Sequence, residues 1–324
     1  MKLKANYFHR WQTVLAILVV SFFLLVAVIA PLMAPDAELM TGEIKRVGSE
    51  TDYSPHPPNS QSLLGTLPRQ LDVFYGLIRG TRGAVVFGVL ATFFTAFLGL
   101  LIGSISGLIG GKVSSWLMRF TDAFLSIPMI AAVALIEQLL EIIQLNLTKN
   151  TDFFTITLGI IPHSIQDTPL GRFVASLNPV MLALIAFSWM AYARTFNTQV
   201  ASLRQVEYVQ AARSVGVKPL RILFRHIFPN AISPIIVLAA KDISSMVMLQ
   251  ATFTFIGFQG KSAWAQVLVV GRDWIIGQAG NPFTYWWVWL PVTLAIILFG
   301  VGWNLLGDEI NFWMNPQKDY DYRK

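Results

Sequence analysis

Long apolar runs separated by polar segments dominate the pattern along this chain. A helix needs about 20 consecutive, mostly apolar residues to cross the hydrocarbon core of a bilayer. Six runs approach or exceed this length, so the pattern predicts an all-α, polytopic membrane protein with six transmembrane helices. They are Trp11–Met33, Gly83–Ile109, Val113–Leu140, Pro179–Met190 extended through Ala201, Ala231–Phe255 and Tyr285–Leu306.

Composition agrees with this prediction. Of the 324 residues, 54% are hydrophobic and only 13% are charged, which is too apolar for a soluble domain of this length. The first run is longer than the apolar region of a signal peptide and has no A-x-A-like cleavage site after it, so we expect a retained anchor. Pro128 lies inside the third run and predicts a kink there.

Basic residues predict the orientation, because cytoplasmic loops carry an excess of Lys and Arg. With the N-terminus inside, the cytoplasmic segments hold more basic residues than the longer outer segments, which explains the pI near 9.6. We find no patterned basic and aromatic surface that would indicate nucleic acid binding. The inner basic residues are Lys2, Lys4, Arg10, Lys112, Arg119, Arg194, Arg204, Arg213, Lys218, Arg221, Arg225, Lys318, Arg323 and Lys324.

Three segments are predicted to lie outside. Residues 35–80 form an exposed loop with an interfacial helix around Leu71–Ile78. Residues 141–178 contain the apolar stretch "FFTITLGII", which is too short to span a bilayer and is expected to pack on the outer surface. The third segment, which begins at Gly257, mixes Gly, Trp and charged residues and predicts a lid-like or interfacial loop.

The stretch "EYVQAARSVGVKPLRILFRHIFPNAISP" contains two short amphipathic helical patterns separated by Gly216. Pro219 is placed to begin the second helix and Pro229 to end it. Such a pair of helices can insert an apolar face into a groove of a partner while its charges pair at the rim. A basic amphipathic helix on anionic lipid is the alternative, and composition does not distinguish the two. The apolar positions are Val206, Val209, Ala212 and Val215, then Leu220, Leu223, Phe224 and Ile227.

The spacing within this stretch favours the docking interpretation. Glu207, Ala211, Ala212, Gly216 and the triplet Ile227-Phe228-Pro229 resemble the "EAA…G" loop of ABC importer permeases, with Phe228 where that family usually has Leu. The likeness extends from Ser62 to Pro316 and includes "WNLLGDEINFWMNP" and an element formed by Arg119, Asp122 and Pro128. Within the family, the chain resembles the dipeptide, oligopeptide and nickel branch. The chain departs from the pattern at "GTLPRQLDV" and in a long insertion at residues 137–178.

This resemblance implies the ABC importer type I permease fold, in which a core of five spans follows an additional N-terminal span. It divides the chain into residues 1–34 (N-terminus and first helix), 35–80 (extracytoplasmic loop), 81–310 (permease core, with a coupling loop at 204–229) and 311–324 (cytoplasmic tail). It further implies that Glu207, Ala211, Ala212, Gly216, Arg221, Arg225 and Pro229 belong to an ATPase-docking loop.

The implied function is ATP-driven uptake of dipeptides or oligopeptides across the bacterial inner membrane, with nickel or a metal chelate as the alternative cargo. The implied partners are a second homologous permease, two ABC ATPase subunits and an extracytoplasmic substrate-binding protein. The chain has no Gly-x-x-x-x-Gly-Lys-Ser/Thr loop, so the ATPase subunits would bind the ATP and we expect no cofactor in this chain.

A membrane-embedded enzyme and a passive channel are the alternatives from other classes. An enzyme needs convergent acids, histidines or a nucleophile with its base, yet none of the four histidines pairs with acids at ligand spacing and cysteine is absent. We therefore predict no catalytic, cofactor-binding or metal-binding residues. A channel would have no use for a docking loop. The histidines are His9, His56, His163 and His226.

Lys241 and Asp242 are adjacent charges about ten residues into the fifth run, where exposure to lipid would be costly. Neighbouring helix residues point about 100° apart and cannot face one partner. One of the two could line a polar pathway while the other pairs with a neighbouring span, with Asp122 as a conceivable partner for Lys241. A buried pair that only fixes helix packing is the alternative.

Overall fold

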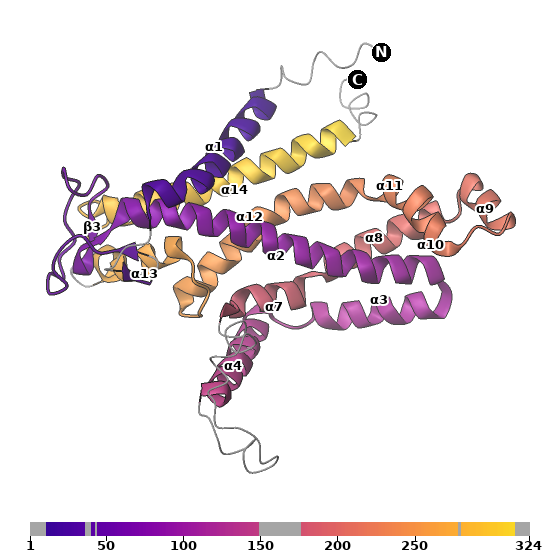
Figure 1. The fold of residues 1–324 in the computed structure, drawn as a ribbon, viewed down its shortest axis with the longest axis horizontal. Coiled ribbons are helices and arrows are strands. Elements are labelled where there is room, and N and C mark those ends of the chain that lie inside the picture. The colour runs from indigo at the N-terminus through magenta and orange to yellow at the C-terminus, as the bar shows by residue number, and fades with distance from the viewer. Residues whose placement is uncertain (1–10, 36–39, 43, 149–175, 278–279, 315–324) are drawn as a thin grey trace.

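The computed structural model describes residues 11–35, 40–42, 44–148, 176–277 and 280–314, which form a bundle of long helices (Figure 1). The predicted surface stretch "FFTITLGII" lies outside these residues. The long helices are α1 (Trp11–Met33), α2 (Val73–Ile109), α3 (Gly111–Leu125), α4 (Met129–Thr148), α7 (Pro179–Ser188), α8 (Met190–Leu203), α12 (Ser233–Ile256), α13 (Ala263–Ile276) and α14 (Trp286–Met314).

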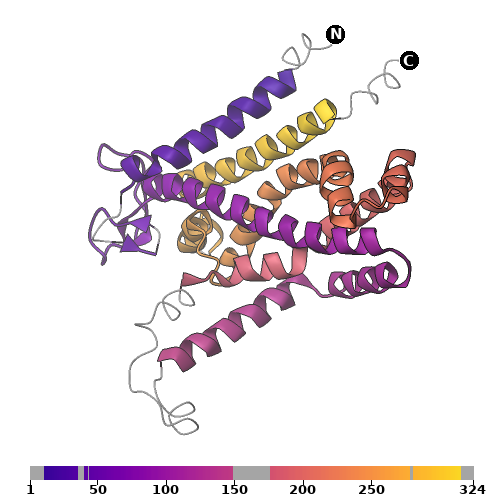
Figure 2. The same ribbon diagram turned by 45° about the vertical axis from the view of Figure 1, so that its right-hand side comes forward.

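Short elements lie at both ends of the bundle. At one end, which we call the strand end, β1 (Met40–Thr41) pairs antiparallel with β2 (Ile44–Lys45), and β3 (Thr66–Leu67) pairs with β4 (Leu71–Asp72) around a 3-10 turn at Pro68–Gln70. The opposite end, the loop end, carries α9 (Glu207–Ser214), α10 (Pro219–Ile222), a π-helical turn at Leu223–Ile227 and α11 (Phe228–Ala231). The start of α1 and the end of α14 point toward the loop end, and these two helices run side by side (Figure 2).

Among the residues that the structure describes, five helical segments are long and apolar enough to cross a membrane, and a bent pair brings the possible number to six. The all-α membrane fold is therefore confirmed. The bent pair is α3 and α4, whose axes differ by 86° across the short break that contains Pro128. Proline lacks a backbone N–H and pushes the residue before it out of the helical region, so the predicted kink is in fact a sharp break.

Two elements differ from the sequence prediction. The second helix begins at Val73, ten residues before Gly83, so most of the expected interfacial helix at Leu71–Ile78 is the start of α2, and Leu71–Asp72 form β4. Asp72 caps this start by accepting hydrogen bonds from the backbone N–H groups of Phe74 (2.8 Å) and Tyr75 (3.3 Å). The third outer segment contains a helix, α13, where a lid-like loop was predicted. Ser262 caps the start of α13. The apolar face of α13 was not recognised in the sequence because glycines and charged residues lie on either side of it.

Aromatic side chains from three helices form the core near the strand end. Phe23 of α1, Trp264 of α13 and Phe299 of α14 meet edge to face, with ring centroids 5.2–6.2 Å apart. Trp264 is fully buried, and its indole N–H donates to the Leu77 carbonyl of α2 at 3.1 Å. A Cβ on Gly80 would lie 2.2 Å from the Trp264 ring, so this glycine lets α13 rest on α2.

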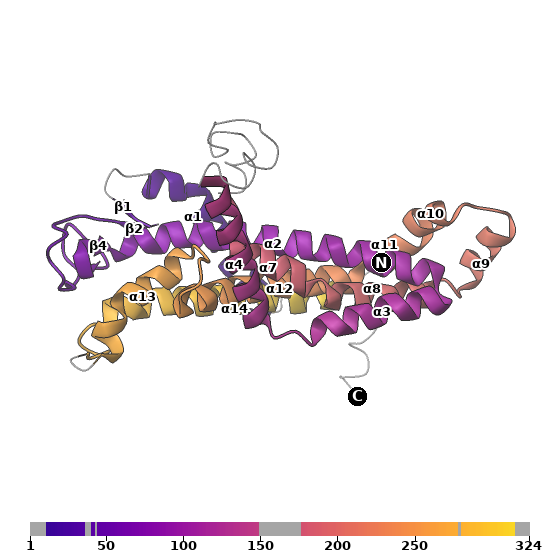
Figure 3. The same cartoon turned by 90° about the horizontal axis from the view of Figure 1, so that it is seen from below.

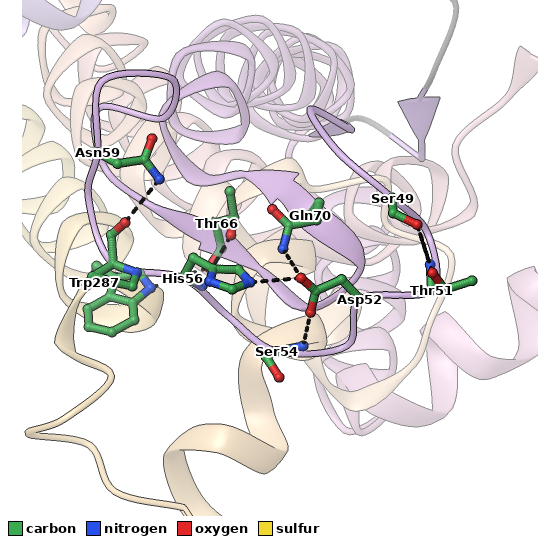
Figure 4. A network of polar contacts seen from close by, with 10 residues as sticks. Ser49, Thr51, Asp52, Ser54, His56, Asn59, Thr66, Gln70 and Trp287 are labelled. Carbon is green, nitrogen blue, oxygen red and sulfur yellow. Dashed lines mark hydrogen bonds and ion pairs between the residues drawn. The ribbon is translucent and has the colours of Figure 1, made fainter.

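The 46–72 segment is held over the strand end by a polar network around Asp52 (Figure 4). The Asp52 carboxylate contacts the His56 ring nitrogen at 2.8 Å and accepts hydrogen bonds from the Gln70 amide (2.9 Å) and the Ser54 backbone (3.0 Å). The His56 hydrogen bond, followed by that of Ser54, lowers the pKa of Asp52 below its usual value. The Trp287 indole of α14 donates to the Thr66 carbonyl at 3.3 Å, which ties this segment to the bundle.

Helices α2 and α8 approach closely because α2 presents glycine at three successive turns. A Cβ on Gly99 would lie 2.3 Å from the Tyr192 Cβ, one on Gly103 would lie 2.6 Å from the Ala193 carbonyl oxygen, and one on Gly107 would lie 2.6 Å from the Val200 Cβ. These distances leave no space for a larger residue. Small residues at such spacing permit close backbone contact between membrane helices.

This packing predicts that Gly99→Ala destabilises the protein. The new methyl group would force α2 and α8 apart, and overpacking of this kind typically costs about 1–3 kcal/mol. Gly83→Ala is the matched control, because Gly83 lies on the same helix and a Cβ there would meet no atom of the residues that the structure describes within 4 Å. Thermal unfolding of both variants in one detergent would check the prediction. Equal midpoints for the two variants would contradict it.

Candidate functional site: the loop at residues 204–231

The polypeptide between α8 and α12 forms the loop end of the bundle and projects beyond the other helices (Figures 1 and 3). It contains the two short helices that the sequence predicts, α9 and α10, with Gly216 between them. Both of its ends are continuous with long helices, so a displacement of the loop would act directly on α8 and α12.

Gly216 is required by the backbone and not by packing. Its φ angle is +78°, in the left-handed region that favours glycine, and a Cβ there would meet no atom of the described residues within 4 Å. The Gly216 N–H bonds the Arg213 carbonyl at 2.9 Å, and the Val217 N–H bonds the Ala212 carbonyl at 3.1 Å. This pattern is a Schellman cap, which ends α9 and turns the chain toward α10.

The second half of the loop differs from the prediction at Pro229. Pro229 lies in the first turn of α11 and does not end the helical path. The reason is the π-helical turn before it, in which the Phe228 N–H bonds the Leu223 carbonyl five residues back. Proline has no backbone N–H with which to complete an ordinary helical turn, and the wider turn accommodates the proline ring. The Asn230 amide then donates to the His226 carbonyl at 2.8 Å.

The apolar positions of the loop separate into two groups. Val209, Ile222 and Ile227 are buried, and they belong to one cluster with Tyr192 and Phe196 of α8. This group anchors the loop to the bundle. Its side chains are therefore not available to a partner, although the sequence analysis expected the whole apolar face to insert into a partner's groove. The second group remains on the surface and consists of Val206, Tyr208, Val215, Leu220 and Phe224.

The predicted docking residues mostly lie on the surface. Ala212 is half-buried, whereas Glu207, Ala211, Gly216, Arg221, Arg225 and Pro229 are exposed. Glu207 occupies the first turn of α9, where a negative charge is favourable because of the helix dipole. Arg221 and Arg225 have no ion-pair partner within the part of the chain that the structure describes. The loop therefore presents mixed charges around exposed apolar side chains, as a docking surface would.

The intramembrane charges have other partners than the sequence suggested. Lys241 Nζ lies 2.6 Å from the Asp308 carboxylate of α14, and its stem crosses Gly307, where a Cβ would lie 2.6 Å from Lys241 Cγ. Asp122 of α3 instead pairs with Arg194 of α8, so the proposed contact between Asp122 and Lys241 is wrong. Asp242 faces α8, where its carboxyl lies near the Tyr192 hydroxyl without hydrogen-bonding geometry.

Two further polar contacts, which involve four residues, were missed by the sequence analysis. The Thr13 hydroxyl of α1 donates to the buried Glu309 carboxylate of α14 at 2.6 Å, and the Asn304 amide of α14 donates to Ser244 of α12 at 3.1 Å. Together with Lys241 and Asp308, these contacts join α1, α12 and α14 in the half of the bundle near the loop end. Partners 60–296 residues apart leave no signal in local spacing.

Comparisons with known proteins identify the family. The model of the family "Binding-protein-dependent transport system inner membrane component" matches residues 99–318. A nickel transport system permease protein of Escherichia coli is 27% identical over 317 residues, which is 96% of this chain and 97% of that protein. A probable D,D-dipeptide transport system permease protein of the same organism is 28% identical over 81% of this chain and 75% of its own length.

A third relative, an oligopeptide transport system permease protein of Bacillus subtilis, is 25% identical over 81% of this chain and 73% of that protein. Among solved structures, the chain aligns with the MetNI methionine ABC transporter in inward facing conformations, with a TM-score of 0.49 and 16% identity over 74% of this chain and 97% of that chain. Because the family model matches more than half of the sequence, this chain belongs to the inner membrane components of binding-protein-dependent ABC transport systems, in the branch that includes peptide and nickel permeases.

Proposed function

We propose that this chain is the permease subunit of an ATP-driven peptide importer, and that residues 204–229 dock onto an ATPase subunit. The observation that carries the proposal is the loop itself, which projects from the bundle with Glu207, Gly216 and Arg221 on its surface. The chain is not an enzyme: in this family, ATP hydrolysis resides in separate subunits. ATP would therefore be bound by the partners, and this chain would need no cofactor.

The assembly that we propose contains a second, homologous permease, two ABC ATPases and an extracytoplasmic binding protein. The exposed side chains of Val215, Leu220 and Phe224 would enter a groove on the ATPase, with the charged residues at its rim. The buried anchor of Val209, Ile222 and Ile227 makes the loop move as one body with α8. Closure of the ATPases would then displace α8 and α12 and alternate the access of the pathway.

Peptides are the cargo that we favour, because several relatives carry dipeptide or oligopeptide transport in their names. Nickel is the second candidate, since the nickel permease aligns over nearly the whole chain. The two are distinguished by stimulation of ATPase activity in the reconstituted transporter with its own binding protein. Stimulation by a dipeptide and not by Ni²⁺ supports peptide uptake, and the reverse result supports nickel uptake.

The proposed orientation places the loop end in the cytoplasm and the strand end outside. It predicts that a single cysteine at the exposed position Ser60 reacts with a membrane-impermeant thiol reagent in intact cells, whereas one at the exposed position Ser214 reacts only after permeabilisation. The native chain contains no cysteine, so no background labelling arises. Labelling of Ser214→Cys from outside would invert the topology.

The docking role predicts that loop variants lose coupling and keep their fold. Gly216→Pro removes the N–H that bonds the Arg213 carbonyl and cannot adopt a positive φ, while Glu207→Arg with Arg221→Glu reverses the rim charges. Both variants should assemble but lose most of the substrate-stimulated ATPase activity. Gly257→Pro is the control, because Gly257 also has positive φ and open surroundings but caps α12 outside the loop. Normal stimulation in both loop variants would refute docking through this surface.

We further propose that Lys241 and Asp308 face the pathway between the two permeases. Their side chains are 39% and 61% exposed on this chain, and lipid contact would be unfavourable for both charges. Asp242 would instead stabilise the contact between α12 and α8 near Tyr192. Asp122 contributes to the pathway wall only through its ion pair with Arg194, which joins α3 to α8.

This arrangement makes Lys241→Met the informative variant. Because the ion pair is partly exposed, its loss should cost about 1 kcal/mol or less, and the transporter should still assemble. We expect the rates for acidic and basic peptides to change in opposite directions, measured in proteoliposomes. Asp242→Asn is the control and should affect both peptides alike. Wild-type rates for both peptides with Lys241→Met would show that the pair only fixes helix packing.

A further inference from the structure

A cationic cavity of about 750 Å³ opens at the loop end, between the turn that joins α2 to α3 and the end of α8. Its charged lining residues are Lys112 and Arg119 of α3 and Arg204 at the end of α8, and none of the described residues that line it is acidic. Lys112 and Arg119 are seven residues apart on α3 and so lie on the same face. Ser114, Ser115 and Gln205 add uncharged polar side chains to the wall.

The three cations are available for a ligand to different degrees. Lys112 and Arg119 have no ion-pair partner among the residues that the structure describes. Arg204 is fixed by hydrogen bonds from its Nη1 to the carbonyls of Leu108 (3.0 Å) and Gly107 (3.4 Å), which leaves its other N–H groups for the cavity. A Cβ on Gly110 would lie 2.4 Å from the same nitrogen, so glycine leaves room for the guanidinium. Clustered cations without acids favour an anionic ligand.

An apolar groove of about 530 Å³ adjoins this cavity on α3 and shares Lys112 and Trp116 with it. The groove is otherwise lined by Val113, Leu117 and Phe120, and Trp116 is 75% exposed. An exposed tryptophan between a basic cluster and an apolar surface is typical of a membrane interface. The ligand must therefore carry an anion and a long apolar chain next to each other.

We propose that this site binds an anionic phospholipid of the cytoplasmic leaflet. The phosphate would lie among Lys112, Arg119 and Arg204, and an acyl chain would follow Val113, Trp116 and Phe120. This goes beyond the proposed transport function and does not depend on the cargo. Arg204 stands three residues before Glu207, the first residue of α9, so lipid held there would steady the base of the docking loop.

Lipid selectivity tests the proposal directly. A fluorophore on Ser115→Cys, in the otherwise cysteine-free full chain, reports quenching by brominated phosphatidylglycerol or brominated phosphatidylcholine in nanodiscs. We expect phosphatidylglycerol to quench preferentially. Removing each cation should weaken this preference about fivefold, so Lys112→Gln with Arg119→Gln should nearly abolish it. Lys112→Arg with Arg119→Lys should preserve it, as should the control Arg213→Gln with Lys218→Gln outside the cavity.

Several results would overturn the assignment. Equal quenching by the two lipids, or a preference that survives in the glutamine variant, would exclude the cationic site. Displacement of phosphatidylglycerol by millimolar inorganic phosphate, seen as loss of its preferential quenching, would identify a site for a soluble phosphate. Loss of all lipid quenching when the second permease is present would identify a protein interface. If the glutamine variant does not fold, the wild-type chain itself provides the test, because its preference for phosphatidylglycerol must decrease as salt is added. A preference that does not change with salt would refute the lipid site.

Discussion

The close approach of α2 and α8 is the constraint on which the position of the loop depends. Inside a bilayer, apolar side chains gain little from leaving lipid, so helices associate through tight packing and not through hydrophobic burial. Gly99, Gly103 and Gly107 allow that packing by exposing backbone to α8 at three turns. The end of α8 is thereby fixed against the end of α2, where Arg204 reaches the last carbonyls of α2.

Polar contacts divide the bundle into two differently organised halves. Near the strand end, the helices are held by aromatic contacts, with Phe23, Trp264 and Phe299 at the centre. Near the loop end, Thr13, Lys241 and Asn304 make polar contacts to neighbouring helices. Hydrogen bonds in a low-dielectric medium have defined geometry and discrete alternatives. The polar half lies on the side of the bundle that carries the 204–231 loop, so a displacement of that loop would reach these contacts through α12.

The sequence predicted those features that arise from local chemistry. Apolar run length placed the first helix at its observed bounds, and Pro128 marked the break between α3 and α4. Gly216 was recognised as a turn because only its backbone conformation matters. The start of α2 was misplaced because hydropathy stops at charged residues, whereas Asp72 caps a helix that continues through Arg79 and Arg82.

Long-range pairing could not be predicted in the same way. Asp122 was offered as a partner for Lys241 only because both are charged and within spans, yet Arg194 and Asp308 are the observed partners. Pro229 was misjudged because its effect depends on the π-helical turn before it. The loop face was misjudged because amphipathic spacing identifies apolar positions without saying whether the protein itself or a partner covers them. Val209 and Val215 have the same character in sequence, and only one is buried.

Tyr192 connects the loop to the intramembrane charges. It lies in the apolar cluster that includes Val209 and Ile227, its Cβ is what a side chain at Gly99 would meet, and its hydroxyl lies near Asp242 on α12. A change in the position of the loop, in the spacing of α2 from α8 or in the rotation of α12 would therefore alter the contacts of Tyr192. A movement of the loop that turned α8 would shift the Tyr192 hydroxyl relative to Asp242. Because Lys241 directly precedes Asp242 on α12, a rotation of α12 would also move the Lys241–Asp308 pair. If Lys241 faces the pathway and the loop docks as proposed above, the adjacent charges would have different roles, with Asp242 responding to movement of α8 and Lys241 lying at the pathway.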